Sequence, residues 1–350
     1  MTSSAAFAST ADVKSFDVSK HVNYTLGMVL GVDDFQQEFA YLAGRTRWLA
    51  RDAIGYGTLC GLAVSADTGT KGPRLLVTAG TAIVPSGQLV CVKPAQCAYL
   101  NDWLAANATL LDGVSSPSSL SLDLVLCYRD CLVDPVAIPG EPCRQASDLT
   151  SPSRIADSFS LELRQTPPPQ PEERLIRELV DWIRHIPVGG GGPFSTIQDV
   201  EDALRASVQT ITSPLSSPLS SPLSSPLSSP PSGDSIHIGF GSPPASLRID
   251  PARFGDAIGA AFRIWTTEIR PKVHPICPGG CGCCNSQANA TADEPVDCLL
   301  LARVDVPVVK FANEWRVTDA GSVVIDDSRR PILLSTQLQQ EWLQWCRPEV

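Results

Sequence analysis

The chain has 350 residues, of which 43% are hydrophobic and 18% are charged, and its formal net charge is −10. This length suits about two or three domains of the common size, and the apolar fraction is sufficient for buried cores. A protein that binds duplex nucleic acid needs a basic stripe to neutralise phosphates. The longest basic run here is Arg329-Arg330, so nucleic acid is not an expected partner.

Neither a membrane span nor a secretory signal is expected from the sequence. No apolar run approaches the ~20 residues of a spanning helix, so no transmembrane segment is expected. Residues 1–21 are rich in Ser and Ala but lack the basic and continuous apolar regions of a signal peptide. We predict a disordered tail at 1–21 and a cytoplasmic protein.

The next region, 22–166, is predicted to be a helix followed by a β-rich domain. Asp33 and Gln36 form a candidate capping box, and apolar residues then recur at helical spacing as far as Leu49. Glycines bracket short segments that are typical of strands, with a turn at Pro85-Ser86-Gly87. The predicted strands cover 58–64, 75–77, 81–84, 88–92, 120–128 and 156–164.

The middle segment, 167–212, is predicted to be helical. Apolar periodicity indicates helices at 172–185 and 197–211, and the glycines at 189–192 interrupt them. This glycine run lacks the Lys and the strand-to-helix context of a phosphate loop, so we interpret it as a hinge.

A low-complexity segment follows at 213–234. Residues 213–228 are four copies of Ser-Pro-Leu-Ser. Proline at every fourth position excludes both a helix and a central strand. We interpret the segment as an extended linker, and a docking ligand for a proline-reading groove is the alternative.

The remaining residues, 235–350, are predicted to form a small α+β domain with a Cys-rich loop. Helices are expected at both of its ends and three strands between them. The predicted helices are 251–270 and 335–345, and the strands are 299–310, 314–317 and 323–325. The fold class predicted for the whole chain is α+β.

The 12 cysteines are numerous for a protein of a reducing compartment, where clustered thiols are more often metal ligands than disulfides. Thiolate and imidazole ligands suit tetrahedral zinc. The candidate metal ligands are His274, Cys277, Cys281, Cys283, Cys284 and Cys298, and structural zinc is the candidate cofactor. Disulfides and free thiols are the alternatives.

A second group of cysteines has no nearby histidine. It consists of Cys127, Cys131 and Cys143, which are three ligands where zinc takes four. Cys91 or Cys97 would have to complete such a site in space. The sequence does not indicate whether either does.

No catalytic constellation is recognisable. The four histidines lie outside the contexts of known nucleophile and metalloprotease motifs. The neighbouring carboxylates of Asp33-Asp34 and Asp326-Asp327 are poor acid/base partners because adjacent helical side chains point apart. No catalytic or cofactor-binding residue is assigned, and the protein is predicted not to be an enzyme.

Several segments resemble proteins of phage-tail-like contractile injection systems. The first are GMVLGVDDFQQEFAYLAGRTRWLARDAIGYGTLCGLAV and VTAGTAIVPSGQLV. CYRDCLVDPVAIPGEPC and SRIADSF are similar to the next part of the family, and CLLLARVDVPV with DDSRRPILLSTQLQQEWL to its end. The resemblance covers most of 22–165 and 296–345. It implies a structural component near the baseplate or outer shell, present in several copies, and it carries over no catalytic residue.

The leading hypothesis is therefore a non-enzymatic structural subunit of such a particle, at or near its baseplate or outer surface. The expected partners are other subunits of the particle and further copies of the chain. Candidate interface groups are Trp48, Trp342 and Trp345, which are otherwise core residues. The alternative is a zinc-binding interaction module, and an envelope-acting hydrolase is the least favoured reading.

Overall fold

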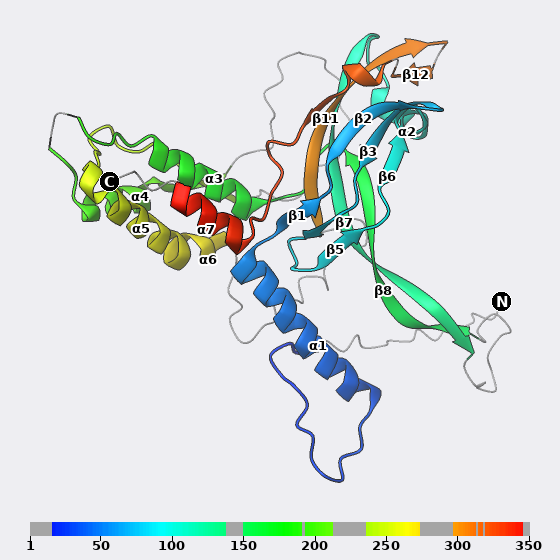
Figure 1. The fold of residues 1–350 in the computed structure, drawn as a ribbon, viewed down its shortest axis with the longest axis horizontal. Helices are drawn as coiled ribbons and strands as arrows, with labels where there is room; N and C mark the ends of the chain where they lie inside the picture. The colour runs from blue at the N-terminus through cyan, green and yellow to red at the C-terminus, as the bar shows by residue number, and fades with distance from the viewer. Residues whose placement is uncertain are drawn as a thin grey trace, which may run out of the picture. The chain divides into compact units, whose positions relative to one another are not determined.

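The computed structural model describes residues 16–137, 150–190, 193–212, 236–273, 297–312, 314–317 and 319–345. These residues form a mixture of helices and strands (Figure 1), which confirms the predicted α+β class. The chain divides into two compact units. Met1–Pro168 and Pro278–Val350 form the first, here called the β-rich unit, and Pro169–Cys277 form the second, the helical unit.

This division differs from the expected one, in which 235–350 formed a domain of its own. Strand β11 (Cys298–Phe311) pairs antiparallel with β7 (Ser118–Ala137), from Cys298 opposite Cys127 to Val308 opposite Ser118. The C-terminal strand thus lies in the centre of an N-terminal sheet. Apolar periodicity identifies a buried strand but does not identify its partner.

The β-rich unit contains one larger sheet and two smaller ones. The larger sheet has the order β12-β11-β7-β8, with β13 also paired to β11, and the smaller sheets have the orders β1-β4-β5 and β2-β3-β6. Their strands are β1 (Gly57–Gly61), β2 (Val64–Gly69), β3 (Gly72–Val77), β4 (Gly80–Ile83), β5 (Leu89–Val92), β6 (Gln96–Tyr99), β8 (Thr150–Arg164), β12 (Glu314–Arg316) and β13 (Val324–Asp326).

The helices and turns of this unit connect or extend the sheets. They are α1 (Val32–Leu49) with the π-helical turn η1 (Ala50–Ile54), α2 (Leu100–Ala106), the 3-10 turns η2 (Ala108–Leu111) and η7 (Ala320–Ser322), and α7 (Thr336–Trp345). The core joins all three sheets to α2. Its fully buried side chains include Leu62, Val84, Leu104, Leu126, Leu299 and Leu301.

Helix α1 begins two residues earlier than the predicted N-cap, Asp33, implies. Gly31 is its N-cap, and the carboxylate of Asp34 accepts a hydrogen bond of 2.8 Å from the Gly31 N–H. The predicted capping pair, Asp33 and Gln36, is therefore wrong. The Asp34 side chain closes the first turn because it lies three residues after Gly31.

The C-terminal end of α1 is attached to the sheets through the predicted turn at 85–87. A Cβ atom on Gly87 would lie 2.2 Å from the Arg47 carbonyl oxygen, and the φ angle of Gly87 is +87°. Only glycine permits this approach. Beside it, Asp297 accepts hydrogen bonds from the Ser86 N–H (2.9 Å) and hydroxyl (2.5 Å). The turn thereby connects α1 to the residue before β11.

Residues 16–21, which we predicted to belong to a disordered tail, instead lie along α1. The side-chain amide of Gln37 donates to the carbonyl oxygens of Asp17 (2.6 Å) and Lys20 (2.5 Å). The Glu38 carboxylate accepts a hydrogen bond of 2.9 Å from the Val22 N–H. Polar side chains of the helix thus order a segment whose own composition gives little indication of order; 1–15 lie outside the described residues.

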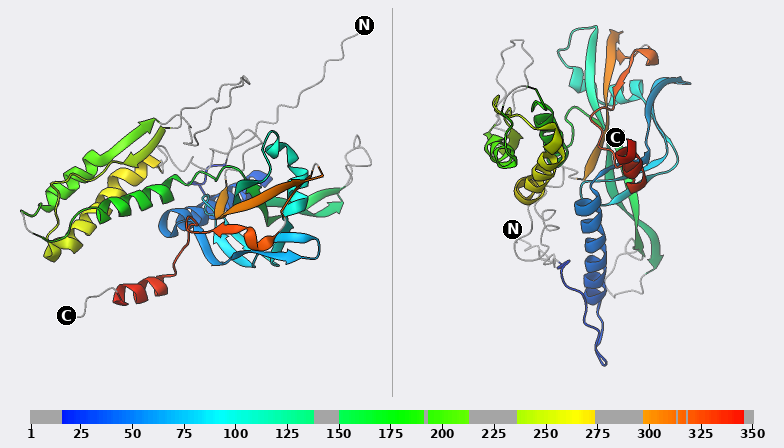
Figure 2. Two further views of the ribbon diagram at one scale, coloured as in Figure 1. Left: turned by 90° about the horizontal axis from the view of Figure 1, so that it is seen from above. Right: turned by 60° about the vertical axis from the view of Figure 1, so that its left-hand side comes forward.

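The helical unit packs three longer helices around a small core. Its elements are α3 (Pro171–Arg184), α4 (Ile197–Ser207), β9 (Val208–Thr212), β10 (Ile236–Phe240), η4 (Pro251–Arg253), α5 (Phe254–Ile264), η5 (Trp265–Ile269) and α6 (Arg270–Val273). Figure 2 shows these helices side by side from two directions. The core includes Leu179, Trp182, Val200, Leu204, Ala261 and Ile264.

The predicted helix at 197–211 ends at Ser207, because 208–212 form a strand. That strand, β9, pairs antiparallel with β10, with Thr212 opposite Ile236. The predicted linker at 213–234 lies outside the described residues, but both of its flanks belong to this one hairpin. The Ser-Pro-Leu-Ser segment therefore connects two neighbouring strands of one unit and does not link two domains.

Candidate assembly surface on helix α1

Most of the predicted metal ligands cannot be placed. His274, Cys277, Cys281, Cys283 and Cys284 lie outside the described residues. Cys298 is buried and forms a disulfide with Cys127, so in this state its sulfur is not a thiolate that could bind zinc. Within the described part of the chain, no three His, Cys, Asp or Glu side chains converge as a metal site.

The second cysteine group is not assembled either. Cys91, Cys97 and Cys131 are exposed free thiols, and Cys143 lies outside the described residues. Cys127 instead pairs with Cys298 across 171 residues of sequence. The two are direct partners in the β7–β11 register, which sequence spacing could not show.

Among the described residues, the Ser86–Asp297 contact comes closest to a catalytic arrangement. Burial raises the pKa of Asp297, while the hydrogen bonds from Ser86 and the charge of Arg47 act in the opposite direction. A serine nucleophile also needs a neighbouring base. The described imidazoles lie elsewhere: the His21 ring centre is 5.0 Å from that of Tyr41, with the two rings tilted, and a His185 ring nitrogen is 2.6 Å from the Asp181 carbonyl oxygen. We therefore interpret the contact as an anchor for the turn.

Helix α1 presents a row of large apolar side chains to solvent. In the chain as described, Val32 is 72% exposed, Phe35 61% and Phe39 70%. Leu42 and Leu49 follow on the same helix at 56% and 58%. A helix in the core of a monomer buries such residues, whereas contiguous exposed apolar surface is typical of an interaction site.

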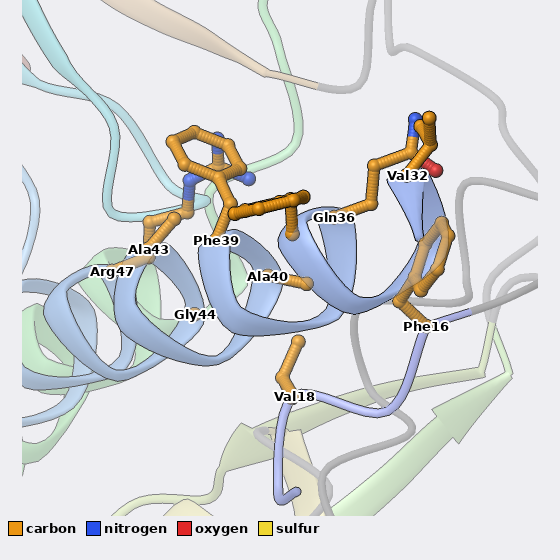
Figure 3. Close-up of a pocket in the computed structure, with 10 residues that line it drawn as sticks. Phe16, Val18, Val32, Gln36, Phe39, Ala40, Ala43, Gly44 and Arg47 are labelled. Atoms are coloured by element: carbon orange, nitrogen blue, oxygen red, sulfur yellow. The ribbon is translucent and has the colours of Figure 1, made fainter. Parts of the chain in front are cut away.

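The opposite side of α1 is covered by the preceding segment. Val18 packs against Gly44 so closely that a Cβ atom on the glycine would lie 2.8 Å from the Val18 Cβ. Figure 3 shows Val18 on one side of the helix and Phe39 on the other. Because Gly44 has no side chain, the preceding segment packs closely on this face of α1, and the apolar face stays exposed.

A shallow apolar groove lies beside the exposed row (Figure 3). Only two of its lining residues, Gln36 and Arg47, have polar side chains. The lining consists of Phe16, Val18, Val32, Phe35, Gln36, Phe39, Ala40, Ala43, Gly44 and Arg47. Eight of the ten lining residues are apolar or glycine and the lining contains no carboxylate, which suits an apolar side chain of a partner better than a polar substrate.

The loop before α1 continues the apolar surface. Tyr24 is 57% exposed, Leu26 108% and Val29 90%. The chain turns here through a hydrogen bond from the Met28 N–H to the Thr25 carbonyl oxygen. In Figure 1 this loop lies at the end of α1 that points away from the sheets of the same unit. Loop and helix together form the candidate assembly surface, defined as 24–30 and 32–49.

Of the predicted interface aromatics, Trp48 is 54% exposed and lies on α1. Trp342 and Trp345 belong to α7, but their side chains are outside the description. The sequence prediction did not include the loop at 24–30. The sequence of this loop is a run of apolar residues interrupted by a glycine, a pattern that is equally common in buried turns.

No protein-family model matches the chain, and no curated protein matches it significantly. Among the described residues, no helix is both long and apolar enough to span a membrane.

Proposed function

We propose that this protein is a non-enzymatic structural subunit of a contractile, phage-tail-like injection particle, located at or near its baseplate or outer surface. The observation that carries the proposal is the exposed apolar row on α1. It lies within 27–64, the longest segment that resembles the family. A subunit that is incomplete without neighbours is expected to leave such a surface open.

The arrangement of the resembling segments supports the proposal. The N-terminal and C-terminal segments fold together, since β11 pairs with β7. The Thr58 N–H donates to the Pro331 carbonyl oxygen, and the Leu333 N–H to the Thr58 carbonyl oxygen, both at 2.9 Å. The resembling halves thus belong to one unit, and the helical unit, which lies outside the resembling segments, falls between them in the sequence.

The test is to purify contractile particles from the native cell and identify their proteins by mass spectrometry. The proposal expects this chain to copurify at a fixed ratio to the sheath protein. Deletion of its gene should leave particles that lack one feature in electron micrographs, and the wild-type gene should restore it. Absence of the chain from purified particles would overturn the proposal.

A variant distinguishes assembly from folding. Phe39→Glu places a charge on the exposed row, so the free chain should fold normally but enter particles poorly. Phe262→Glu is the matched control, because Phe262 is 54% exposed on α5 of the helical unit. Equal incorporation of both variants would contradict a role for α1 in assembly.

A further inference from the structure

The exposed row on α1 follows a heptad repeat. Val32, Phe35, Phe39, Leu42, Thr46 and Leu49 are spaced by 3, 4, 3, 4 and 3 residues, and all six are exposed. These are the a and d positions of a coiled-coil seam. A helix that packs on its own core usually shows a wider apolar stripe. The spacing together with the exposure of all six side chains therefore indicates a second helix as the partner.

The back of the same helix is already occupied. Gln37 and Gly44 take the f positions, opposite the seam, and both contact 16–22. α1 extends beyond the smaller sheets of its unit (Figure 1). A partner helix therefore has one face available to it, the a/d face.

The charges on α1 are divided between its two halves. Asp33, Asp34 and Glu38 lie in the N-terminal half, and Arg45 and Arg47 in the C-terminal half. Two parallel copies would place like charges together, which is unfavourable. Two antiparallel copies would place the acidic half of each against the basic half of the other. The helix is thus complementary to itself under a two-fold axis, as a symmetric dimer interface requires.

We propose that α1 pairs antiparallel with α1 of a second copy of this chain. This inference rests on the proposed role as an assembling subunit, and it adds which surface and which partner are used. A two-fold axis between Ala40 and Tyr41 aligns each a position with a d position of the other copy. The resulting layers are Val32 with Leu49, Phe35 with Thr46, and Phe39 with Leu42.

The register also matches the charges beside the seam. Glu38 and Arg45 are both g positions, and g positions face each other across an antiparallel pair. Each Glu38 therefore meets Arg45 of the other copy, twice per dimer. Within one copy, Glu38 holds the Val22 N–H, and the Arg45 guanidinium lies 5.5 Å from the centre of the Tyr41 ring. Both side chains are thus held at the helix surface, and such rim pairs set orientation more than affinity.

The first experiment measures the mass of the full chain by sedimentation velocity from about 1 to 100 μM, a range that detects dissociation constants in the micromolar region. We expect a monomer–dimer equilibrium. Phe39→Glu should raise the dissociation constant by at least about 100-fold, because it puts two charges into the central layers. Phe262→Glu should leave it unchanged. A wild-type monomer at 100 μM, or a dimer that Phe39→Glu does not weaken, would overturn the pairing.

The second experiment tests the antiparallel orientation. Glu38→Arg and Arg45→Glu should each weaken the homodimer by about tenfold, since each places like charges opposite one another. When the two variants are mixed, both cross-pairs again join opposite charges, so the heterodimer should be tighter than either homodimer. Because the heterodimer still contains one Glu38→Arg chain, its tighter association could not be explained by the hydrogen bond between Glu38 and the Val22 N–H. A mixture that associates no better than its components would overturn the orientation.

The outcomes separate this inference from the proposed function. A chain that is monomeric alone but present in purified particles would refute the pairing and leave the structural role intact. A chain that dimerises through α1 but is absent from particles would do the reverse.

Discussion

The β7–β11 strand pair and helix α1 are both rich in apolar residues, but they differ in where those residues point. Leu122, Leu126 and Leu299 are at most 1% exposed, because the small sheets and the two strands cover one another. Phe35 and Phe39 are more than 60% exposed. The same kind of residue thus stabilises the fold in one region and remains available for association in the other. Whether an apolar residue is buried or exposed depends on whether another segment of the same chain packs against it.

The largest expected effect is on the covalent link within the sheet. Replacing Cys127 and Cys298 together by Ala should lower the free energy of unfolding by about 4 kcal/mol, because the disulfide closes a long loop in the unfolded chain. Urea unfolding of the β-rich unit would measure this. The matched control is Cys60→Ala with Cys91→Ala, two exposed thiols whose loss should change little. Equal stability of both variants would show that the disulfide does not hold the sheet.

A Leu→Ala substitution in each region tests whether its apolar side chains stabilise the fold. Leu126→Ala should cost about 3 kcal/mol, since it removes a fully buried side chain and leaves a cavity. Leu42→Ala, at 56% exposure, should cost less than about 0.5 kcal/mol in the monomer. Both are measured by urea unfolding in a Phe39→Glu background, which suppresses association. A large cost at Leu42 there would mean that the row packs inside its own chain.

The stability of the protein is expected to depend on pH through Asp297, which lies between α1 and β11. Burial raises the pKa of this carboxyl in the folded state, so the folded protein holds the proton more tightly than the unfolded one. Its contribution to stability is therefore complete below the ordinary aspartate pKa and is lost as the pH rises through the folded pKa. Asp297→Asn should remove this decline from urea midpoints measured between pH 3 and 7. An unchanged pH profile would contradict the prediction.

A small effect is also expected at Glu162, on the surface of the larger sheet. Burial opposes ionisation of Glu162, but hydrogen bonds from Arg164, Ser160 and Arg129 outweigh it and lower the pKa to about 2. The stabilisation is present above the ordinary glutamate pKa and is lost as the pH falls toward 2. Because the group is partly exposed, Glu162→Gln should cost less than about 1 kcal/mol at pH 7. A cost that persists undiminished at pH 2 would point to packing and not to charge.

The sequence was sufficient for local structure and insufficient for pairing. The strands predicted at 120–128 and 156–164 lie inside β7 and β8, because apolar and β-branched residues determine them locally. The partnership of β11 with β7, and with it the Cys127–Cys298 bond, joins residues far apart in the chain. No local pattern contains that information.

The sequence predicted the helix of the candidate surface but not which of its faces is exposed. The spacing of Val32, Phe35, Phe39 and Leu42 correctly predicted an amphipathic helix. Over so few turns, however, the periods of 3.5 and 3.6 residues that separate a coiled-coil seam from a core-facing helix hardly diverge. The contacts of Gln37 and Gly44 with 16–22 showed which face of the helix is already covered.

The β9–β10 hairpin has a consequence for variation among closely related chains. Thr212 and Ile236 are paired neighbours, so the ends of the Ser-Pro-Leu-Ser segment are fixed whatever the length between them. The entropy cost of closing a flexible loop grows by only about 0.6 kcal/mol for each doubling of its length. Replication slippage can therefore add or remove whole repeats almost without penalty to folding. Alleles of this gene are expected to differ in repeat number, while the structure of the β9–β10 hairpin stays the same.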